Sequence, residues 1–417
     1  MQTFLTGLPS GIVVLIALGL AVFWATRRAA IAPPRLLRLG WIARILGAMA
    51  FLGLELAGVY AMGGLYRYHP GGAVIAEAWR SLSAPAMPFR WGTEFIHYLT
   101  GSLYFLTGAS VIAGFAIFAT LGFLGSVLFY LAFSRAFPQA DRRVFALLIF
   151  LYPSLVFWTS DLGKDSVIFF ALGIAAFGYA MLLRDGLSVR SLATTLIGLC
   201  LVMLVRPHIA AASAIAMLIP SVGALVHHRI RNPAARIAVA LLLAAVCLLI
   251  VGISLRALGS EVSLDGMFQY IRVWSEGSSY GGSAFTPPDM TTPAGLLLAI
   301  PSVLFRPYPW EIHNLAALAA GIESLVLLAL LIWKRKALAL PFRLPPDPFV
   351  IFLVLEVLFT LLLLNTMGNI GLLARQRTQL LPFLFAWLCM DRPYSEQAAP
   401  PNSRGDSVPS GTQSGQA

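Results

Sequence analysis

Residues 10–26 read SGIVVLIALGLAVFWAT, an apolar run that ends at the pair Arg27 and Arg28. A helix of this length comes close to crossing the roughly 30 Å of hydrocarbon in a bilayer. No basic region precedes the run and the arginines follow it, which is typical of an uncleaved first membrane span and not of a signal peptide. The stretch therefore predicts a fold that begins with a transmembrane helix.

The composition extends this prediction to the whole chain. It has 417 residues, of which 59% are hydrophobic and 11% are charged, and its mean hydropathy is +0.82. A soluble domain carries roughly 25% charged residues, and one aqueous core cannot bury so much apolar surface. We expect an all-α, polytopic transmembrane protein whose main partner is the lipid bilayer. Arginines that hold loops in the cytoplasm explain the net charge of +11, so nucleic acid is not an expected partner.

Apolar windows long enough to span a bilayer occur about eleven times. They lie near 10–26, 45–64, 108–133, 143–158, 166–183, 191–205, 209–226, 236–255, 312–333, 348–364 and 378–390. Alternate connections between the windows are short and basic. Their basic residues are Arg27, Arg28, Arg35, Arg38, Arg44, Arg135, Arg142, Arg143, Arg184, Arg190, Arg229, Arg231, Arg236, Lys334, Arg335, Lys336 and Arg343. The positive-inside rule then predicts an outer N-terminus and a cytoplasmic C-terminus.

We expect one multi-span membrane domain over residues 1–392 and a disordered cytoplasmic tail over 393–417, which is rich in Ser, Pro, Gly and Gln. Two long outer loops interrupt the spans. Residues 65–107 predict one or two interfacial helices. Residues 256–311 predict a flexible loop that ends in an apolar segment broken by Pro301, which suggests a re-entrant or half-depth helix.

The second outer loop ends in the stretch LFRPYPWEIHN, Leu304–Asn314. Here Arg306, Glu311 and His313 stand among aromatic and proline residues. Aromatic rings mark a membrane–water boundary, so charges fixed there are well placed to meet a membrane-embedded ligand with a charged head. The alternative is an aromatic belt with a snorkelling arginine.

Several cations lie at the predicted outer tips of spans, where the positive-inside rule would not place them. Arginine remains charged and binds phosphate oxygens in bidentate fashion. An outer bowl of such residues suits a polyprenyl phosphate or pyrophosphate that carries a sugar. The expected ligand-binding residues are Lys164, Arg206, His208, Arg272, Arg306, Arg375 and Arg377. The alternative is that each arginine pairs with a neighbouring carboxylate and only holds loops together.

Carboxylates near such a bowl are candidate general bases toward a sugar hydroxyl. We expect Glu311, Asp165 or Glu94 in this role. The hairpin FWTSDLGKDS also contains Asp161, a further plausible base. In the structural alternative, Lys164 is held between Asp161 and Asp165, and the turn caps the next helix.

Three acids fall within predicted spans, at Glu55, Glu323 and Glu356. Intramembrane acids are costly and are functional candidates by default, and they give the main support for a transporter. The alternative is a protonated glutamate that bonds to a neighbouring helix. The sequence has no P-loop, zinc-ligand spacing or nucleophile elbow, so an ATP-driven pump is excluded, and no metal or cofactor is expected.

Four segments carry a resemblance to known proteins: YPSLVFWTSDLGKDS, LVRPH, LFRPYPWEIHN and GNIGLLARQR. With them the chain resembles the polytopic proteins of bacterial envelope polysaccharide assembly, both the O-antigen polymerase and ligase-like proteins and the GT-C glycosyltransferases. The first group is similar in having about ten to twelve spans and a large late outer loop. That resemblance implies that Arg206, Arg272, Arg306, Arg375 and Arg377 face a lipid pyrophosphate. Where GT-C enzymes carry an acid after an early span, this chain reads GGLYRYHPGG.

These observations lead to an expected function in the bacterial inner membrane. The chain would transfer glycosyl groups onto or between polyprenyl-linked saccharides at the outer face, as a polymerase, with the loop 273–296 closing over the saccharide. Other envelope polysaccharide assembly proteins are expected partners. The alternatives are a GT-C transferase that uses a polyprenyl-phosphate sugar, a transporter or flippase of an anionic or lipid-linked substrate, and a scaffold for a synthase complex.

Overall fold

The computed structural model describes residues 7–28, 31–59, 63–222, 244–254, 256, 277–279, 282–342 and 347–390. This part of the chain is built from helices, with one isolated β-bridge between Ala284 and Asn369. The predicted all-α fold is therefore confirmed. The α-helices are α2 (Leu8–Arg28), α3 (Pro34–Leu56), α4 (Gly64–Arg80), α5 (Thr93–Thr107), α6 (Val111–Ala136), α7 (Arg142–Leu151), α8 (Pro153–Trp158), α9 (Lys164–Arg184), α10 (Val189–Val205), α11 (Pro207–Ser221), α14 (Pro293–Phe305), α15 (Leu315–Trp333), α16 (Arg335–Leu338), α17 (Pro348–Leu364), α18 (Ile370–Gln376) and α19 (Leu381–Cys389). Short 3-10 helices cover η2 (Pro309–Glu311), η3 (Leu340–Phe342) and η4 (Arg377–Gln379).

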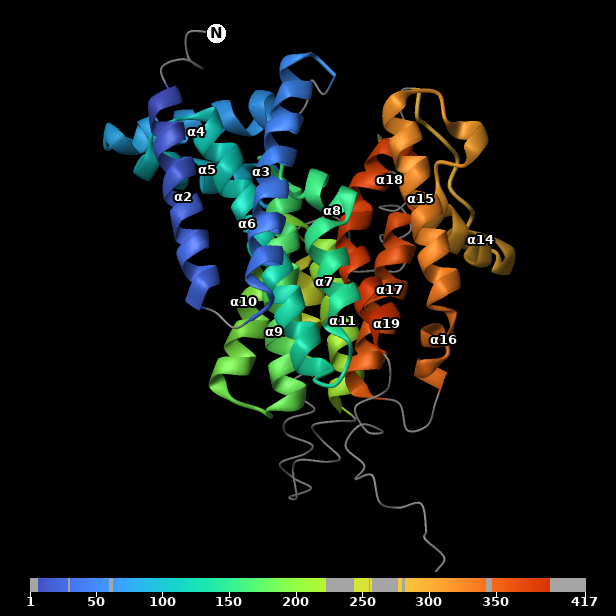
Figure 1. The fold of residues 1–417 in the computed structure, drawn as a ribbon. Helices are drawn as coiled ribbons and strands as arrows, with labels where there is room; N and C mark the ends of the chain where they lie inside the picture. The colour runs from blue at the N-terminus through green and yellow to red at the C-terminus, as the bar shows by residue number, and fades with distance from the viewer. Residues whose placement is uncertain are drawn as a thin grey trace, which may run out of the picture.

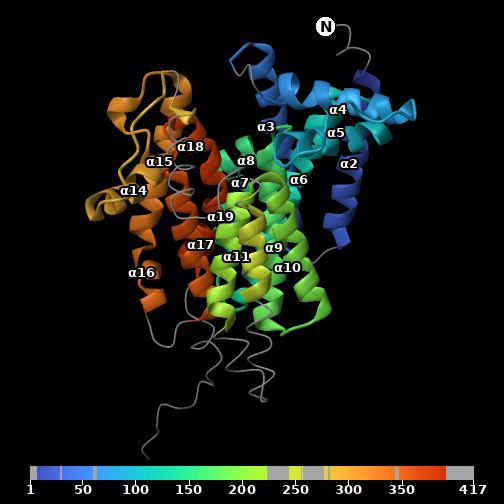
Figure 2. The same ribbon diagram turned by 180° about the vertical axis from the view of Figure 1, so that it is seen from behind.

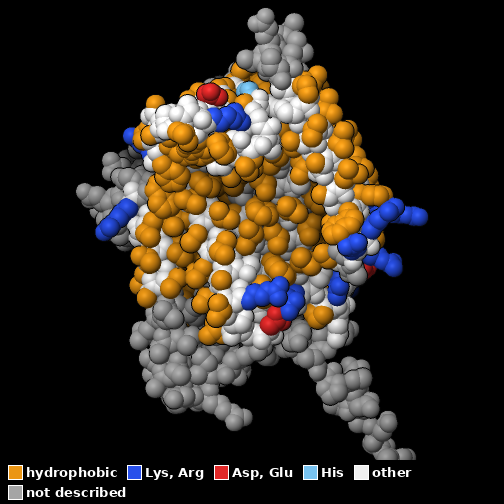
Figure 3. All heavy atoms as spheres, turned by 90° about the vertical axis from the view of Figure 1, so that its left-hand side faces the viewer, with side chains coloured by type: hydrophobic (Ala, Val, Ile, Leu, Met, Phe, Trp, Pro, Cys, Tyr) orange, Lys and Arg blue, Asp and Glu red, His pale blue; other side chains and the backbone are white. Residues whose placement is uncertain are grey.

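Within the described ranges, five helices are long and apolar enough to cross a membrane, namely α2, α3, α6, α9 and α15. Helices α2, α3 and α15 expose much of their apolar surface, as at Ile16 and Leu20 of α2, whereas α6 and α9 are mostly buried in the bundle. Figure 3 shows one face of the molecule covered mostly by apolar side chains with few charged ones. The protein is therefore a membrane protein by composition and by surface. The expected count of about eleven spans stays a prediction, because the remaining apolar helices have 10–17 residues.

Prolines divide two of the expected spans into shorter helices. The window 143–158 contains α7 and α8, which meet at Tyr152 because Pro153 begins a new helix. The window 378–390 contains the end of η4 and the nine-residue α19, with Pro382 in its first turn. Proline lacks the N–H that would continue the preceding helix but fits well in the first turn of a new one.

The helix directions agree with the alternation of loops that the sequence predicts. Helices α2, α6, α9 and α15 run toward the lower end of Figure 1, and basic residues lie at or just beyond their C-terminal ends. Helices α4 and α5, the turn between α8 and α9, and the start of α15 lie at the opposite, upper end. The assignment of the lower end to the cytoplasm stays a prediction. The arginines at 229, 231, 236 and 343, which belong to the predicted basic loops, lie outside the described residues.

One expectation about the basic loops is wrong. The sequence assigned Arg35, Arg38 and Arg44 to the loop after the first span, but α3 begins at Pro34 and contains all three, with Arg44 deepest in the helix. Its side chain is fully buried, and its guanidinium donates to the carbonyl of Phe150 at 3.1 Å and to the hydroxyl of Ser126 at 2.6 Å. Through these bonds Arg44 joins α3 to α6 and α7 and does not mark a loop, although its buried Nε has no hydrogen-bond partner within the described residues.

The two long outer loops contain helices at the upper end. Helices α4 and α5 lie across this end, roughly perpendicular to the bundle (Figures 1 and 2), which agrees with the helices expected in 65–107. The expected break at Pro301 is wrong, because α14 continues through this residue for four more positions, to Phe305. Arg272 and the tail 393–417 lie outside the described residues.

Close helix packing positions the turn between α8 and α9. A Cβ on Gly198 of α10 would lie 2.3 Å from the backbone nitrogen of Ala175, so the backbones of α9 and α10 are almost in contact there. A Cβ on Gly122 of α6 would lie 2.0 Å from the carbonyl oxygen of Thr159. Helix α6 thus presses directly on the first residue of the turn 159–163, which precedes α9 and holds Asp161.

Candidate functional site

The turn 159–163 places two carboxylates next to each other in the interior. Its backbone is fixed by the hydroxyl of Ser166, which donates to the carbonyl of Asp161 at 3.1 Å and to that of Gly163 at 3.0 Å. Asp161 lies in the turn and Asp165 in the first turn of α9, and both side chains are fully buried. Because buried carboxylates require partners, the surrounding elements must supply cations.

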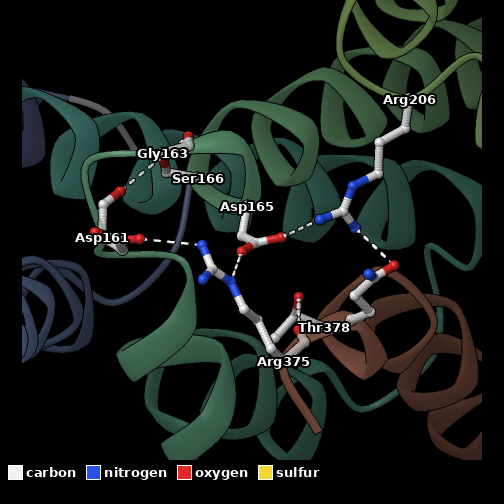
Figure 4. A network of polar contacts seen from close by, with 8 residues as sticks. Asp161, Gly163, Asp165, Ser166, Arg206, Arg375 and Thr378 are labelled. Carbon is white, nitrogen blue, oxygen red and sulfur yellow. Dashed lines mark hydrogen bonds and ion pairs between the residues drawn. The ribbon is translucent and has the colours of Figure 1, made fainter. Parts of the chain in front are cut away.

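Arginines from two other elements meet these carboxylates, as Figure 4 shows. Arg206 follows α10, and its Nη2 lies 2.8 Å from Asp165 Oδ1. Arg375, near the end of α18, donates through Nε to Asp165 Oδ2 and lies with Nη2 3.1 Å from Asp161 Oδ2. Arg206 also donates to the side-chain oxygen of Gln376 at 3.1 Å. We call Asp161, Asp165, Arg206, Arg375 and Gln376 the aspartate–arginine cluster.

Burial and shared charges set the protonation of the groups outside the spans. Burial raises the pKa of Asp161 to about 6, although Arg375 opposes this shift. Burial alone would lower the pKa of Arg375, but the charges of Asp165 and Asp161 have the larger, opposite effect. The pKa of Arg375 is therefore raised overall, and this guanidinium stays charged. Asp161 Oδ1 is buried and accepts no hydrogen bond of regular geometry within the described residues, although the backbone N–H groups of Gly64 and Leu162 lie close enough to favour the ionised carboxylate. Asp161 is thus the carboxylate of the cluster best placed to exchange a proton near neutral pH.

Further cations surround the cluster at the upper end. Lys164 begins α9, and in the described part of the chain its ammonium has no hydrogen bond or close ion pair. Arg67 of α4 and Glu94 of α5 are near enough to Lys164 to act on its charge, and so is Arg206. His208, in the first turn of α11, interacts electrostatically with Arg206 and Lys164. Four cations, Arg67, Lys164, Arg206 and Arg375, therefore stand near four acids, Asp161, Asp165, Glu94 and Glu55. The group carries a net positive charge whenever one of these acids is protonated.

Arg306 and Glu311 form a separate group. Their side chains make an ion pair with 3.2 Å between Arg306 Nη1 and Glu311 Oε1, and Glu311 Oε2 accepts from the backbone N–H of Tyr308 at 2.8 Å. The Arg306 guanidinium also lies over the rings of Phe285, at 4.0 Å, and Tyr308, at 5.2 Å. The structural alternative considered for arginines, pairing with a neighbouring carboxylate, describes Arg306.

The structure places Arg377 apart from Arg206 and Arg375, with which the sequence grouped it. Its guanidinium is buried and donates to the carbonyl of Leu304 at 2.8 Å, to the hydroxyl of Ser324 at 3.1 Å and to the carbonyl of Arg306. Successive residues of one short segment thus point to different neighbours. Arg375 and Gln376 belong to the aspartate–arginine cluster, whereas Arg377 holds the backbone that carries Arg306.

The three intramembrane glutamates have structural partners. Glu55 Oε2 accepts from the N–H of Leu65 at the start of α4, at 2.8 Å. Glu323 accepts from the N–H of Ser154 at the start of α8, at 2.9 Å. Glu356 accepts from the hydroxyl of Ser213 in α11, at 2.6 Å. Two of these acids therefore satisfy backbone N–H groups at helix starts, and the third joins α17 to α11.

Sequence reasoning found part of this site and missed part. The structure brings together Asp165, Lys164, Arg206 and Arg375, with His208 and Glu94 beside them. The sequence analysis did not predict Gln376 or Arg67 as members of this site. The position of Gln376 between two arginines was a signal for the first, and the position of Arg67 in the first outer loop was a signal for the second.

No protein-family model, curated protein or solved structure matches this chain. In the ranges that the structure covers, no group of three or more His, Cys, Asp or Glu side chains could hold a metal ion. The function must therefore be argued from the chemistry of the cluster itself.

Proposed function

We propose that this protein is a membrane glycosyltransferase that acts on polyprenyl-phosphate- or polyprenyl-pyrophosphate-linked saccharides, at the outer face of a bacterial inner membrane. The observation that carries the proposal is the gathering of four cations, Arg67, Lys164, Arg206 and Arg375, around buried carboxylates at the upper end of an apolar helix bundle. Arg375 shows why this charge is available to a ligand. It uses two nitrogens on the aspartates, and a guanidinium has five N–H donors.

The cluster supplies the groups that such a transfer needs. Lys164, Arg206 and Arg375 would bind the phosphate oxygens and stabilise the negative charge that develops on the leaving group. Asp161 would accept the proton of the acceptor hydroxyl. The bond from the acceptor oxygen to the anomeric carbon forms as the bond from that carbon to the phosphate oxygen breaks, and the phosphate leaves with the electron pair. Asp165 touches both arginines and would hold them in place.

The same site fits a polymerase, which acts on a polyprenyl pyrophosphate, and a GT-C-type transferase, which uses a polyprenyl-phosphate sugar, because both donors present phosphate oxygens to the cations. Transport receives less support. The acids that favoured it make structural hydrogen bonds, two of them at helix starts. At the lower end, Arg184 is paired with Asp347 at 2.8 Å, far along α9 from the cluster.

The test is the lipid-linked saccharide profile of cells that carry Lys164→Gln, compared with wild type, a deletion and Lys164→Arg. Lys164 is chosen because its removal leaves no buried carboxylate without its close partner. We expect single repeat units to accumulate on the lipid and long polymer to disappear, with Lys164→Arg partly active. A polymer that lacks one sugar would identify a GT-C-type transferase. A wild-type profile from Lys164→Gln, at normal protein level, would contradict the proposal.

A further inference from the structure

A second group of side chains at the upper end has the composition of a sugar-binding surface. It consists of Phe285, Arg306, Tyr308, Trp310 and Glu311, which we call the Trp310 platform. We infer that the Trp310 platform binds sugar rings of the lipid-linked saccharide, so that Arg306 and Glu311 recognise sugar hydroxyls and not the phosphate. This inference rests on the proposed function, because it concerns the part of the same substrate that lies beyond the phosphate.

One ring of the platform, that of Trp310, is exposed, and the rings of Tyr308 and Phe285 behind it are half-buried. Trp310 is 80% exposed, and its ring lies 5.1 Å from that of Tyr308, with an angle of 30° between the planes. The Arg306 guanidinium continues the arrangement, since it lies 4.0 Å from the centre of the Phe285 ring. The exposed Trp310 ring, supported by the tilted Tyr308 ring beside it, offers a stacking surface to a ligand with an apolar face.

The polar groups beside the rings distinguish this surface from a plain aromatic belt. A sugar ring has C–H groups on its faces and hydroxyls around its edge, so its site needs both stacking and planar hydrogen-bonding groups. The Arg306–Glu311 ion pair supplies donors and acceptors next to each other. Arg306 Nε and Nη1 are buried, and neither makes a hydrogen bond within the described part of the chain. The contact of Arg306 with Glu311 is an ion pair only. An aromatic belt requires no such pair.

The platform is joined to the aspartate–arginine cluster through α18. At the start of this helix, Phe285 donates its backbone N–H to Gly368 at 2.9 Å, beside the bridge between Ala284 and Asn369. At its end, Arg375 contacts the aspartates, and Arg377 bonds to the backbone of Arg306. The helix Ile370–Gln376 is only about 10 Å long. The cluster and the platform therefore contact the same short helix, which would let a saccharide attached to a phosphate in the cluster extend toward the platform.

Two lipid probes test the inference, with purified full-length protein in nanodiscs. One is undecaprenyl phosphate, which has no sugar, and the other is the lipid-linked saccharide extracted from cells deleted for the gene. Trp310→Ala is expected to weaken binding of the saccharide-bearing lipid about tenfold and to leave binding of undecaprenyl phosphate unchanged. Trp310→Phe, which keeps a ring, is expected to restore most of the affinity.

The control is Trp333→Ala, at the other end of α15, because Trp333 is also exposed, at 63%. It should leave the affinity for both lipids unchanged. Equal weakening of both lipids by Trp310→Ala, or no weakening of either, would overturn the platform as a sugar site. A different result would contradict the proposed function itself: the affinity of Lys164→Gln for undecaprenyl phosphate would equal that of the wild type.

Discussion

Asp165 and Asp161 are neighbours with the same chemistry, yet the structure predicts opposite effects on stability when each becomes asparagine. Asp165 is fully buried and contacts Arg206 and Arg375. A hydrogen bond to a charged group contributes about 1.5–3 kcal/mol. Asparagine keeps one oxygen but turns an NH2 toward an arginine, so one such bond is lost and a guanidinium loses its counter-charge. We expect Asp165→Asn to lower the free energy of unfolding by about 3 kcal/mol.

Asp161→Asn should instead leave stability at pH 7 unchanged or raise it. Burial raises the pKa of Asp161 from 3.8 to about 6, so the ionised side chain is disfavoured in the folded protein by about 3 kcal/mol. Asparagine resembles the neutral carboxyl. Because the folded state holds the proton more tightly than the unfolded state, stability from this group falls as the pH rises from about 4 to about 6. That fall should be absent from Asp161→Asn.

The assay is reversible unfolding of purified wild type and both variants in mixed micelles, followed at pH 5 and pH 7. Asp165→Asn should unfold at a clearly lower denaturant level, whereas Asp161→Asn should not. Equal destabilisation by the two substitutions would refute the assignment of Asp165 as the structural partner of the arginines and of Asp161 as the carboxylate left for proton transfer.

Three further predictions follow from the same contacts. The rate of transfer, as kcat/KM, should rise with pH through about 6 and level off above it, since Asp161 must be ionised to accept a proton; a flat profile between pH 5 and pH 8 would argue against Asp161 as the base. Glu323→Gln keeps an oxygen for the Ser154 N–H and should retain transfer activity in membranes. Glu323→Ala removes this acceptor and should lower the free energy of unfolding by about 1 kcal/mol. Loss of transfer in Glu323→Gln would instead favour an ionisable role for this acid. Gly122→Ala places a Cβ against the Thr159 carbonyl and should lower both stability and transfer. Gly53→Ala in α3 meets no atom within 4 Å and should be neutral or stabilising by up to about 1 kcal/mol. Equal thermal stability of the two variants would contradict this packing.

The helical framework was predictable because hydropathy is a local property. The windows 10–26 and 166–183 correspond to α2 and α9 within a few residues. The start of α3 was missed, since Arg44 reads as a loop residue in the sequence. Only the carbonyl of Phe150 and the hydroxyl of Ser126, which are distant in the chain, show why this arginine is buried.

The site was predictable only as far as charges can be sorted by side. That sorting put Arg206, Arg375 and Asp165 at the same end, and the structure brings them into contact. It could not separate Arg306 and Arg377 from them, because that depends on the packing of α14, α15 and α18. The sequence also gave no reason to prefer Asp161 over Asp165, since the number of arginines each contacts is a property of the folded chain.

The central claim is that the cations of the cluster bind a lipid phosphate, and Lys164 tests it most directly. The measurement is the dissociation constant for undecaprenyl phosphate of the purified protein in nanodiscs, for wild type, Lys164→Gln and Lys164→Arg, with thermal stability followed in parallel. Loss of one charge-assisted bond, worth about 1.5–3 kcal/mol, predicts at least about tenfold weaker binding by Lys164→Gln, a smaller loss in Lys164→Arg, and unchanged stability. The same dissociation constant in all three proteins would contradict the account.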